Sequence, residues 1–131
     1  MKIDHIGIAT RQLEDATGIW RDALGLEPGH TQEVTEQGVR VTMLPIGESQ
    51  IELLEPLSAD SPVGKFLEKR GPGVHHIAIE VEDIGLALAR LKEKGARLID
   101  ETPRVGANNC LVAFVHPTAA NGVLLELVQH R

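Results

Sequence analysis

The sequence of 131 residues lacks the features that define several large protein classes. Cys110 is the only cysteine, so the chain can form neither an intrachain disulfide nor a multi-cysteine zinc ribbon. Aromatic residues make up 2% of the chain and tyrosine is absent, which argues against an aromatic surface for stacking single-stranded nucleic acid. The formal net charge of −6 argues against a protein that binds phosphate backbones. We therefore expect no nucleic-acid partner.

Long apolar segments are also missing. No run approaches the roughly 18 apolar residues of a membrane span. The first residues, Met1 to His5, lack the apolar core of a secretory signal. A single thiol suits a reducing compartment. Hydrophobic residues at 42% and charged residues at 24% are typical of a folded globular domain. We therefore expect a soluble cytoplasmic protein with no membrane partner.

One pattern of a strand followed by a helix occurs twice. Residues 3–9 and residues 74–80 each read as a short buried strand, and each is followed by apolar residues at helical spacing. The expected helix caps and closing glycines are Thr10 and Gly25 in the first copy, and Asp83 and Gly95 in the second. Matching caps and spacings predict an internal repeat.

The rest of each copy reads as three more strands. The first of these is the least defined, around Glu27–Val34 in one copy and Arg97–Ile99 in the other. The remaining strands are expected over residues 39–44, 50–55, 110–115 and 123–128. Between the copies, Ser61, Pro62 and Gly71 have the positions of an N-cap, a first-turn proline and a closing glycine, which predicts a linking helix.

The predicted fold class is α+β, with two paired βαβββ modules that form a cupped mixed sheet with helices on its outer face. Each module of about 60 residues is too small to bury a good core alone. We therefore expect a single domain over residues 1–131. It comprises module one (about 1–57), the linking helix (about 61–70) and module two (about 73–130).

Four polar side chains have related positions in the repeat. His5 and His76 lie in the first strand of their modules, while Gln50 and Glu126 lie in the last. Because side chains alternate along a strand, each of the four lies on the face opposite two large apolar residues of its strand. These apolar pairs are Ile6 and Ile8, Ile51 and Leu53, Ile77 and Ile79, and Leu125 and Leu127. The repeat therefore predicts that His5, Gln50, His76 and Glu126 meet on the concave face.

Two imidazoles, an amide oxygen and a carboxylate form a mixed ligand set for a divalent metal. With one anionic ligand, the bound dication keeps a formal charge near +1, which suits a Lewis acid. Co²⁺, Ni²⁺, Mn²⁺ or Fe²⁺ fits such a site better than structural zinc.

The other polar groups that stand out lie outside this pattern. We interpret His30, His116 and His130 as loop or terminal residues, and Lys65, Lys69 and Arg70 as a solvated helix face or a contact for a phosphorylated ligand.

Several segments resemble the vicinal oxygen chelate (glyoxalase/bleomycin-resistance) superfamily and, within it, the methylmalonyl-CoA epimerases. The resemblance covers nearly the whole chain. Its segments are 4–9, 36–39, 51–56, 61–67, 73–78, 98–101, 114–117 and 122–127. It implies metal ligation at the positions of His5, Gln50, His76 and Glu126, with Co²⁺ favoured and Ni²⁺, Mn²⁺, Zn²⁺ or Fe²⁺ as alternatives. It also implies a homodimer and an acyl-CoA thioester substrate whose (R) and (S) forms are interconverted.

The sequence departs from the family at three places. Some members carry a glutamate, a second acid/base group, where this chain has Val41. A Gly-Ala-His-Gly loop is replaced by residues 106–109, and a lysine by Thr118. The first departure bears on the second catalytic group, and the other two affect a loop near the substrate.

The expected reaction is α-proton abstraction with a metal-stabilised enolate. Glu126 is the leading base, while the donor on the opposite face stays open among Glu33, Glu36, Glu52 and a bound water. Two alternatives also stay open: a glyoxalase I-type lactoylglutathione lyase, and a metal-free small-molecule binding module. An extradiol dioxygenase fits less well, because its iron site lacks the glutamine.

Overall fold

The computed structural model describes residues 1–131 and divides into two compact units. We call residues 5–75 the N-terminal unit, and residues 1–4 together with residues 76–131 the C-terminal unit. The boundaries fall inside strands β1 (Lys2–Ala9) and β5 (Gly73–Glu80). No helix is both long enough and apolar enough to cross a membrane.

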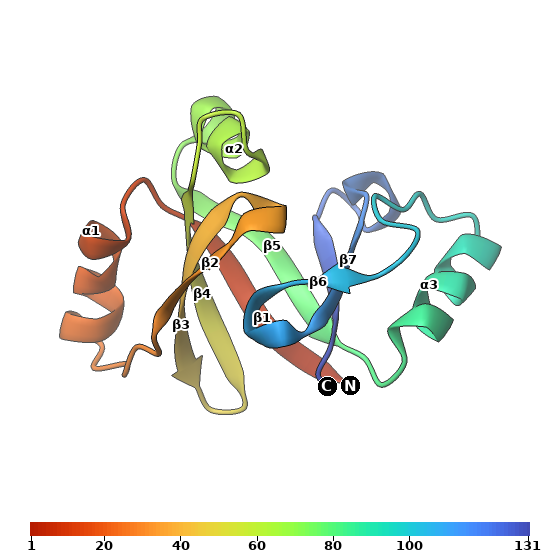
Figure 1. Ribbon diagram of the computed structural model, residues 1–131, viewed down its shortest axis with the longest axis horizontal. Helices are drawn as coiled ribbons and strands as arrows, with labels where there is room; N and C mark the ends of the chain where they lie inside the picture. Colours follow the sequence, from red (N-terminus) through yellow and green to blue (C-terminus); the bar gives the residue numbers. More distant parts are fainter. The chain divides into compact units, whose positions relative to one another are not determined.

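The N-terminal unit contains the strand order β2-β3-β4-β1. Its further strands are β2 (Thr31–Val34), β3 (Val39–Ile46) and β4 (Ser49–Pro56). Strand β1 runs parallel to β4, while β3 is antiparallel to both β2 and β4. Helix α1 (Leu13–Thr17) lies beside these strands, and helix α2 (Pro62–Arg70) lies at the end of β4 (Figure 1). A π-helical turn, Gly18–Ala23, extends α1.

The C-terminal unit contains the strand order β5-β8-β7-β6. Its further strands are β6 (Arg104–Val105), β7 (Leu111–Val115) and β8 (Leu125–Gln129). Strand β5 runs parallel to β8, and β7 is antiparallel to both β8 and β6. Helix α3 (Ile84–Glu93) packs against β7 and β8 (Figure 1). The predicted α+β class with two βαβββ modules is confirmed, since both units have the same element order and the same strand directions.

The apolar faces of the strands bury against the helices, as the alternation predicted. In the N-terminal unit, Ile51 and Leu53 of β4 pack in one cluster with Leu13 of α1, and Ile6 and Ile8 of β1 lie against this cluster. In the C-terminal unit, Leu127 packs with Ile84 and Leu88 of α3, and Ile79 and Leu125 lie against them. These clusters leave the histidines and their neighbours on the other face of each strand.

Local caps explain two of the three helices. The Asp83 side chain accepts a hydrogen bond from the Leu86 N–H at 2.9 Å, and the Ser61 hydroxyl accepts one from the Gly64 N–H at 3.1 Å. Both predicted N-caps are therefore confirmed. Helix α1 differs: the Thr10 hydroxyl donates to the Leu54 carbonyl at 3.3 Å and does not cap the helix. The prediction for Thr10 is wrong because the neighbouring strand β4 engages its hydroxyl.

The first strand after the helix of each module agrees with the prediction in the N-terminal unit only. Strand β2 lies within the range expected for the N-terminal unit. In the C-terminal unit, the predicted strand Arg97–Ile99 is wrong: the segment forms an isolated bridge between Leu98 and Val115, with backbone hydrogen bonds on either side of it, but it does not extend into a strand. Strand β6 forms later in the chain. The Asp100 side chain accepts the Phe114 N–H at 2.8 Å, so a carboxylate occupies the edge of β7 where a backbone ladder would have continued.

Candidate metal centre

The N-terminal unit buries one imidazole–carboxylate pair. His5 on β1 and Glu52 on β4 are both buried, with 3% and 5% of their surface exposed. Their Nε2 and Oε1 atoms lie 3.4 Å apart. The two strands are parallel, and the register places Glu52 opposite Gly7, so no side chain from that position separates the pair. One donor nitrogen and one donor oxygen are thus held side by side.

The C-terminal unit buries a second pair of the same kind. His76 on β5 and Glu126 on β8 are each 4% exposed, and their Nε2 and Oε1 atoms lie 2.9 Å apart. The register places Glu126 opposite Ala78, whose small side chain leaves the carboxylate room. The Phe114 ring packs edge-on against the His76 ring with centroids 5.6 Å apart, which limits the rotation of the imidazole.

The register relates Glu52, and not Gln50, to Glu126. In both units the carboxylate lies opposite the residue two positions after the histidine, which is Gly7 in one unit and Ala78 in the other. Gln50 lies opposite His5 itself and is half-buried. Gln50 and Glu52 share a strand face, so alternation alone did not separate them. The signal that could have done so is the flanking sequence, since Glu52 and Glu126 each stand between two apolar residues.

The other acidic candidates for the reaction are less suitably placed. Glu33 lies opposite Arg40 on β2 and is exposed, and Glu36 is exposed on the short 3₁₀ turn that follows β2. Val41 is buried and lies opposite Leu54, so hydrocarbon occupies the position where some family members carry a glutamate. Among Glu33, Glu36 and Glu52, only Glu52 is both buried and in contact with a predicted metal ligand.

The donor atoms of the two pairs suit a divalent cation. Imidazole nitrogen and carboxylate oxygen are common ligands of Co²⁺, Ni²⁺, Mn²⁺, Fe²⁺ and Zn²⁺. A buried carboxylate is costly unless it is paired or coordinates a metal. Here each of Glu52 and Glu126 is buried beside an imidazole, which can bind a metal through its neutral nitrogen. The residues present therefore fit a metal of this class.

His130, which directly follows β8, has a structural role that the sequence did not indicate. Its Nε2 atom lies 2.6 Å from Oδ1 of the buried Asp4, and its Nδ1 atom lies 3.2 Å from the Cys110 sulfur. The interpretation of His130 as a loop or terminal residue outside the repeat pattern is therefore incomplete. It holds the first residues of β1, directly before His5, against the end of β8.

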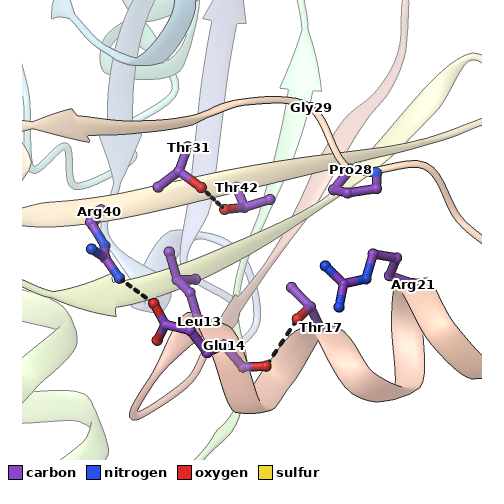
Figure 2. A pocket seen from close by; sticks show the side chains of 9 residues that line it. All are labelled: Leu13, Glu14, Thr17, Arg21, Pro28, Gly29, Thr31, Arg40 and Thr42. Atoms are coloured by element: carbon purple, nitrogen blue, oxygen red, sulfur yellow. Dashed lines mark hydrogen bonds and ion pairs between the residues drawn. The ribbon is translucent and has the colours of Figure 1, made fainter.

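A polar cavity lies on the helix side of the N-terminal unit. Its volume is about 350 Å³, and it is lined by Leu13, Glu14, Thr17, Arg21, Pro28, Gly29, Thr31, Arg40 and Thr42 (Figure 2). Arg40 pairs with Glu14 at 3.2 Å, and the hydroxyls of Thr31 and Thr42 lie 2.7 Å apart. Thr42 shares a strand face with Leu44 of the helix-side cluster. The cavity is therefore on the face of the sheet opposite that of Glu52.

Arg21 at the rim of this cavity is held by its chain neighbour. Its Nε donates to Asp22 at 2.8 Å, and this hydrogen bond, with the charge attraction, lowers the pKa of Asp22 and raises the pKa of Arg21. Both groups are at the surface, so the pair is a local feature of the π-helical turn.

The chain matches the sequence profile of the Glyoxalase/Bleomycin resistance protein/Dioxygenase superfamily over residues 4–114. It is 44% identical over 130 residues to an ethylmalonyl-CoA/methylmalonyl-CoA epimerase of Cereibacter sphaeroides, covering 98% of this chain and 97% of the relative. It is 40% identical over 129 residues to a mitochondrial methylmalonyl-CoA epimerase of Bos taurus, covering 98% of this chain and 74% of the relative.

Solved structures agree with these relatives. A methylmalonyl-CoA epimerase in complex with methylmalonyl-CoA and NH4+ matches with a TM-score of 0.94 and 43% identity, covering 98% of this chain and 93% of that one. The resemblance found in the sequence is thereby confirmed. The shared fold, the profile match and the identity over nearly the whole length lead to one conclusion: this chain belongs to the glyoxalase/bleomycin resistance protein/dioxygenase superfamily.

Proposed function

We propose that this chain is an epimerase that interconverts (R)- and (S)-methylmalonyl-CoA. The observation that carries the proposal is the pair of buried imidazole–carboxylate contacts at equivalent positions of the two units. They occur in a chain 44% identical to a relative named for the epimerisation of ethylmalonyl-CoA and methylmalonyl-CoA. The substrate class is thus a 2-substituted malonyl-CoA thioester.

We further propose that one divalent cation is held by His5, Glu52, His76 and Glu126. Glu52 replaces Gln50 of the sequence prediction, because the register makes Glu52 the counterpart of Glu126. Two carboxylates then neutralise the formal charge of a dication, whereas the set with Gln50 would have left it near +1. Co²⁺ remains the first choice, with Ni²⁺, Mn²⁺, Zn²⁺ and Fe²⁺ as the alternatives. A bound cation supplies positive charge that stabilises the negative charge developing on the substrate carbonyl oxygens.

Glu126 is the proposed base. Its carboxylate takes the α-proton, which is acidic because a thioester and a carboxylate carbonyl flank the α-carbon. The carbon becomes planar as the proton leaves, and a proton delivered to the other face inverts the configuration. Glu52, counted above as an anionic ligand beside His5, has no proton to deliver. The bound water, which is the remaining candidate from the sequence, is therefore the proposed donor on that face, and it is left as hydroxide when its proton moves to the carbon.

The direct test is deuterium wash-in at the α-carbon of methylmalonyl-CoA in D₂O, followed by NMR. We expect the native protein to exchange the α-proton, and a chelator to abolish the exchange until Co²⁺ is restored. The variant Glu126→Gln should exchange about 10³-fold more slowly, with unchanged circular dichroism. Its matched control is Glu93→Gln, which changes an exposed glutamate of α3 and should leave the rate unchanged. Exchange at the native rate in Glu126→Gln would refute the role of Glu126.

With Glu52 as a metal ligand, the glyoxalase I-type lyase remains an alternative function. A glutamate at the second ligand position removes the difference in charge that the sequence suggested between the two enzymes. Incubation with methylmalonyl-CoA and, separately, with the glutathione hemithioacetal of methylglyoxal distinguishes them. Turnover of the hemithioacetal alone would favour the lyase. Full activity after exhaustive metal removal would contradict the proposed cation.

The homodimer and the cytoplasmic location stay predictions. Light scattering of the purified protein measures the first directly, and a mass near twice 14.2 kDa is the expected result.

A further inference from the structure

The cavity on the helix side of the N-terminal unit is lined mainly by polar side chains. Two of them, Thr17 and Thr42, are buried, with 9% and 4% of their surface exposed. Figure 2 shows Arg21 and Arg40 on opposite sides of the cavity, and between them the facing hydroxyls of Thr31 and Thr42, which we call the threonine pair. The candidate metal ligands lie on the other face of the sheet, so the cavity is separate from that site.

The internal repeat shows that the fold does not require this polar wall. In the strand register, Thr42 lies opposite the residue after the buried glutamate of its unit, and Ala113 has the same position in the C-terminal unit. Two positions along, Arg40 corresponds to Leu111 in the same way. Ala113 is fully buried in the apolar cluster under α3, and Leu111 packs against that cluster. Apolar side chains therefore satisfy the packing at both positions.

The helix is attached to the sheet in the same way in both units. Glu55 Oε1 accepts a hydrogen bond from the Leu13 N–H at 3.3 Å. At the corresponding place, Gln129 Oε1 accepts one from the Ile84 N–H at 2.8 Å. The N-terminal unit differs in the wall of the cavity and in the π-helical turn, which places Arg21 at its rim. Turns of this kind occur frequently at functional sites.

The wall of the cavity has hydrogen-bond donors that the protein does not use. Arg21 directs Nε and Nη2 toward Asp22, at 2.8 and 3.5 Å, and its Nη1 group has no protein partner. Arg40 donates through Nη2 to Glu14 at 3.2 Å, and its Nη1 group is likewise without a protein partner. The bond within the threonine pair uses one hydroxyl hydrogen, and the other has no protein acceptor. A ligand that fits must therefore supply acceptor oxygens.

The charges around the cavity limit which acceptor fits. Asp22 pairs with Arg21, and the carboxylates of Glu14 and Glu55 lie 3.2 and 3.0 Å from the Arg40 guanidinium. Because three carboxylates already balance two guanidinium groups, a multiply charged anion such as phosphate would meet repulsion. A singly charged carboxylate matches the planar donor edge of a guanidinium at a lower electrostatic cost.

The size and the remaining lining residues define the rest of the ligand. A volume of about 350 Å³ corresponds to roughly a dozen water molecules at about 30 Å³ each. Leu13 and Pro28 add apolar surface beside the polar groups. A carboxylate that carries a short hydrocarbon chain matches both kinds of surface.

We propose that this cavity binds a small monocarboxylate with a short hydrocarbon chain. The carboxylate accepts hydrogen bonds from the unused N–H groups of Arg21 and from the threonine pair, and the chain lies against Leu13 and Pro28. Binding requires neither the metal nor an acyl-CoA, so this site goes beyond the proposed epimerase activity.

An NMR titration with pentanoate tests the binding without turnover. Pentanamide serves as the neutral analogue, and inorganic phosphate as the multiply charged anion. We expect pentanoate to give saturable shifts of the backbone amide signals of residues 29–31 and 40–42, pentanamide to bind about tenfold more weakly, and phosphate not to saturate. No saturable shift with pentanoate would overturn the site, and equal binding of pentanamide would overturn the assignment of a carboxylate.

Two variants locate the binding in the cavity. Arg21→Gln removes a guanidinium at the surface and should weaken pentanoate binding about tenfold. Thr42→Val removes the buried hydroxyl with little change of shape and should weaken it about threefold or more. The matched control is Arg90→Gln, which changes an exposed arginine of α3 and should leave the affinity unchanged. Native affinity in both cavity variants, or shifts confined to the region of Glu126, would overturn the proposal.

Discussion

The strand pair β1–β4 of the N-terminal unit and the pair β5–β8 of the C-terminal unit differ in what surrounds their buried glutamates. Both place a histidine next to a glutamate, at 3.4 Å in the first unit and 2.9 Å in the second. In the register, Glu126 lies between Ala78 and Phe114, and the Phe114 ring also packs against His76. Glu52 lies between Gly7 and Met43 instead. The repeat has kept strand direction, register and the polar pair, while the neighbouring side chains have diverged.

The helices of the two units differ more than the strands. Helix α3 has ten residues and an aspartate cap, while α1 has five residues, no side-chain cap and a π-helical continuation. A first strand and a last strand held by a ladder of backbone hydrogen bonds tolerate such differences outside the sheet. The comparison indicates that each half of the proposed site depends on strand register and not on the form of the helix behind it.

The largest expected effect is the loss of metal affinity when the glutamate of the N-terminal unit is replaced and that of the C-terminal unit is kept. Glu52→Gln removes an anionic donor from the N-terminal pair, so we expect metal affinity to fall about 100-fold or more. Isothermal titration with Co²⁺ measures this change. The matched control is Gln50→Ala on the same strand face, which should change the affinity less than about threefold, well below the loss of an outer-shell partner. If the Gln50 variant loses the metal and the Glu52 variant keeps it, the original assignment of Gln50 is right.

The next effect concerns the two cores. Leu88→Ala and Leu13→Ala each remove a buried side chain that packs a helix onto its sheet. We expect losses in the free energy of unfolding of about 2–5 kcal/mol. The loss should be larger for Leu88, because the capped, longer helix α3 is less able to collapse into the cavity. Urea unfolding monitored by circular dichroism checks the order. A larger loss for Leu13 would show that the short helix α1 is the more rigid one.

Substitutions at the helix N-caps should change the stability less, and in opposite directions in the two units. Asp83→Ala removes the acceptor for the Leu86 N–H, and we expect it to cost about 1 kcal/mol. Gln12→Asp supplies α1 with the cap that it lacks, and should stabilise the protein by about 0.5 kcal/mol or more. Thermal unfolding of the two variants measures both changes. A loss of stability in Gln12→Asp would contradict the view that α1 is short for want of a cap.

The smallest effect is the acid dependence of the Arg21–Asp22 pair. The folded pKa of Asp22 is lowered from 3.8, first by its hydrogen bond with Arg21 and then by the charge attraction. Its contribution to stability is therefore present above the unfolded pKa and is lost as the pH falls through the folded pKa. Asp22→Asn should therefore lower the stability slightly near pH 7, and the difference from the native protein should vanish as the pH falls through the folded pKa of Asp22. A difference in acid as large as that at pH 7 would show that the pair acts through packing instead.

Much of this fold could be predicted where the signal is local. The caps Asp83 and Ser61 lie within one turn of the N–H groups that they serve, and the strand faces follow from an alternation of two residues. The failures came from contacts distant in the sequence. The hydroxyl of Thr10 bonds to Leu54, 44 positions away, and Asp100 accepts an N–H from β7. Such partners compete with the local pattern and cannot be read from it.

The sequence by itself determined that Gln50 and Glu52 share one strand face with each other, and that His5 lies on the polar side of its own strand. These assignments depend only on alternation along a single chain segment. Only the tertiary structure decided that Glu52, and not Gln50, is the counterpart of Glu126. That choice depends on the register between two strands about 45 residues apart along the chain, and register is set by backbone hydrogen bonds and buried side chains of both strands together.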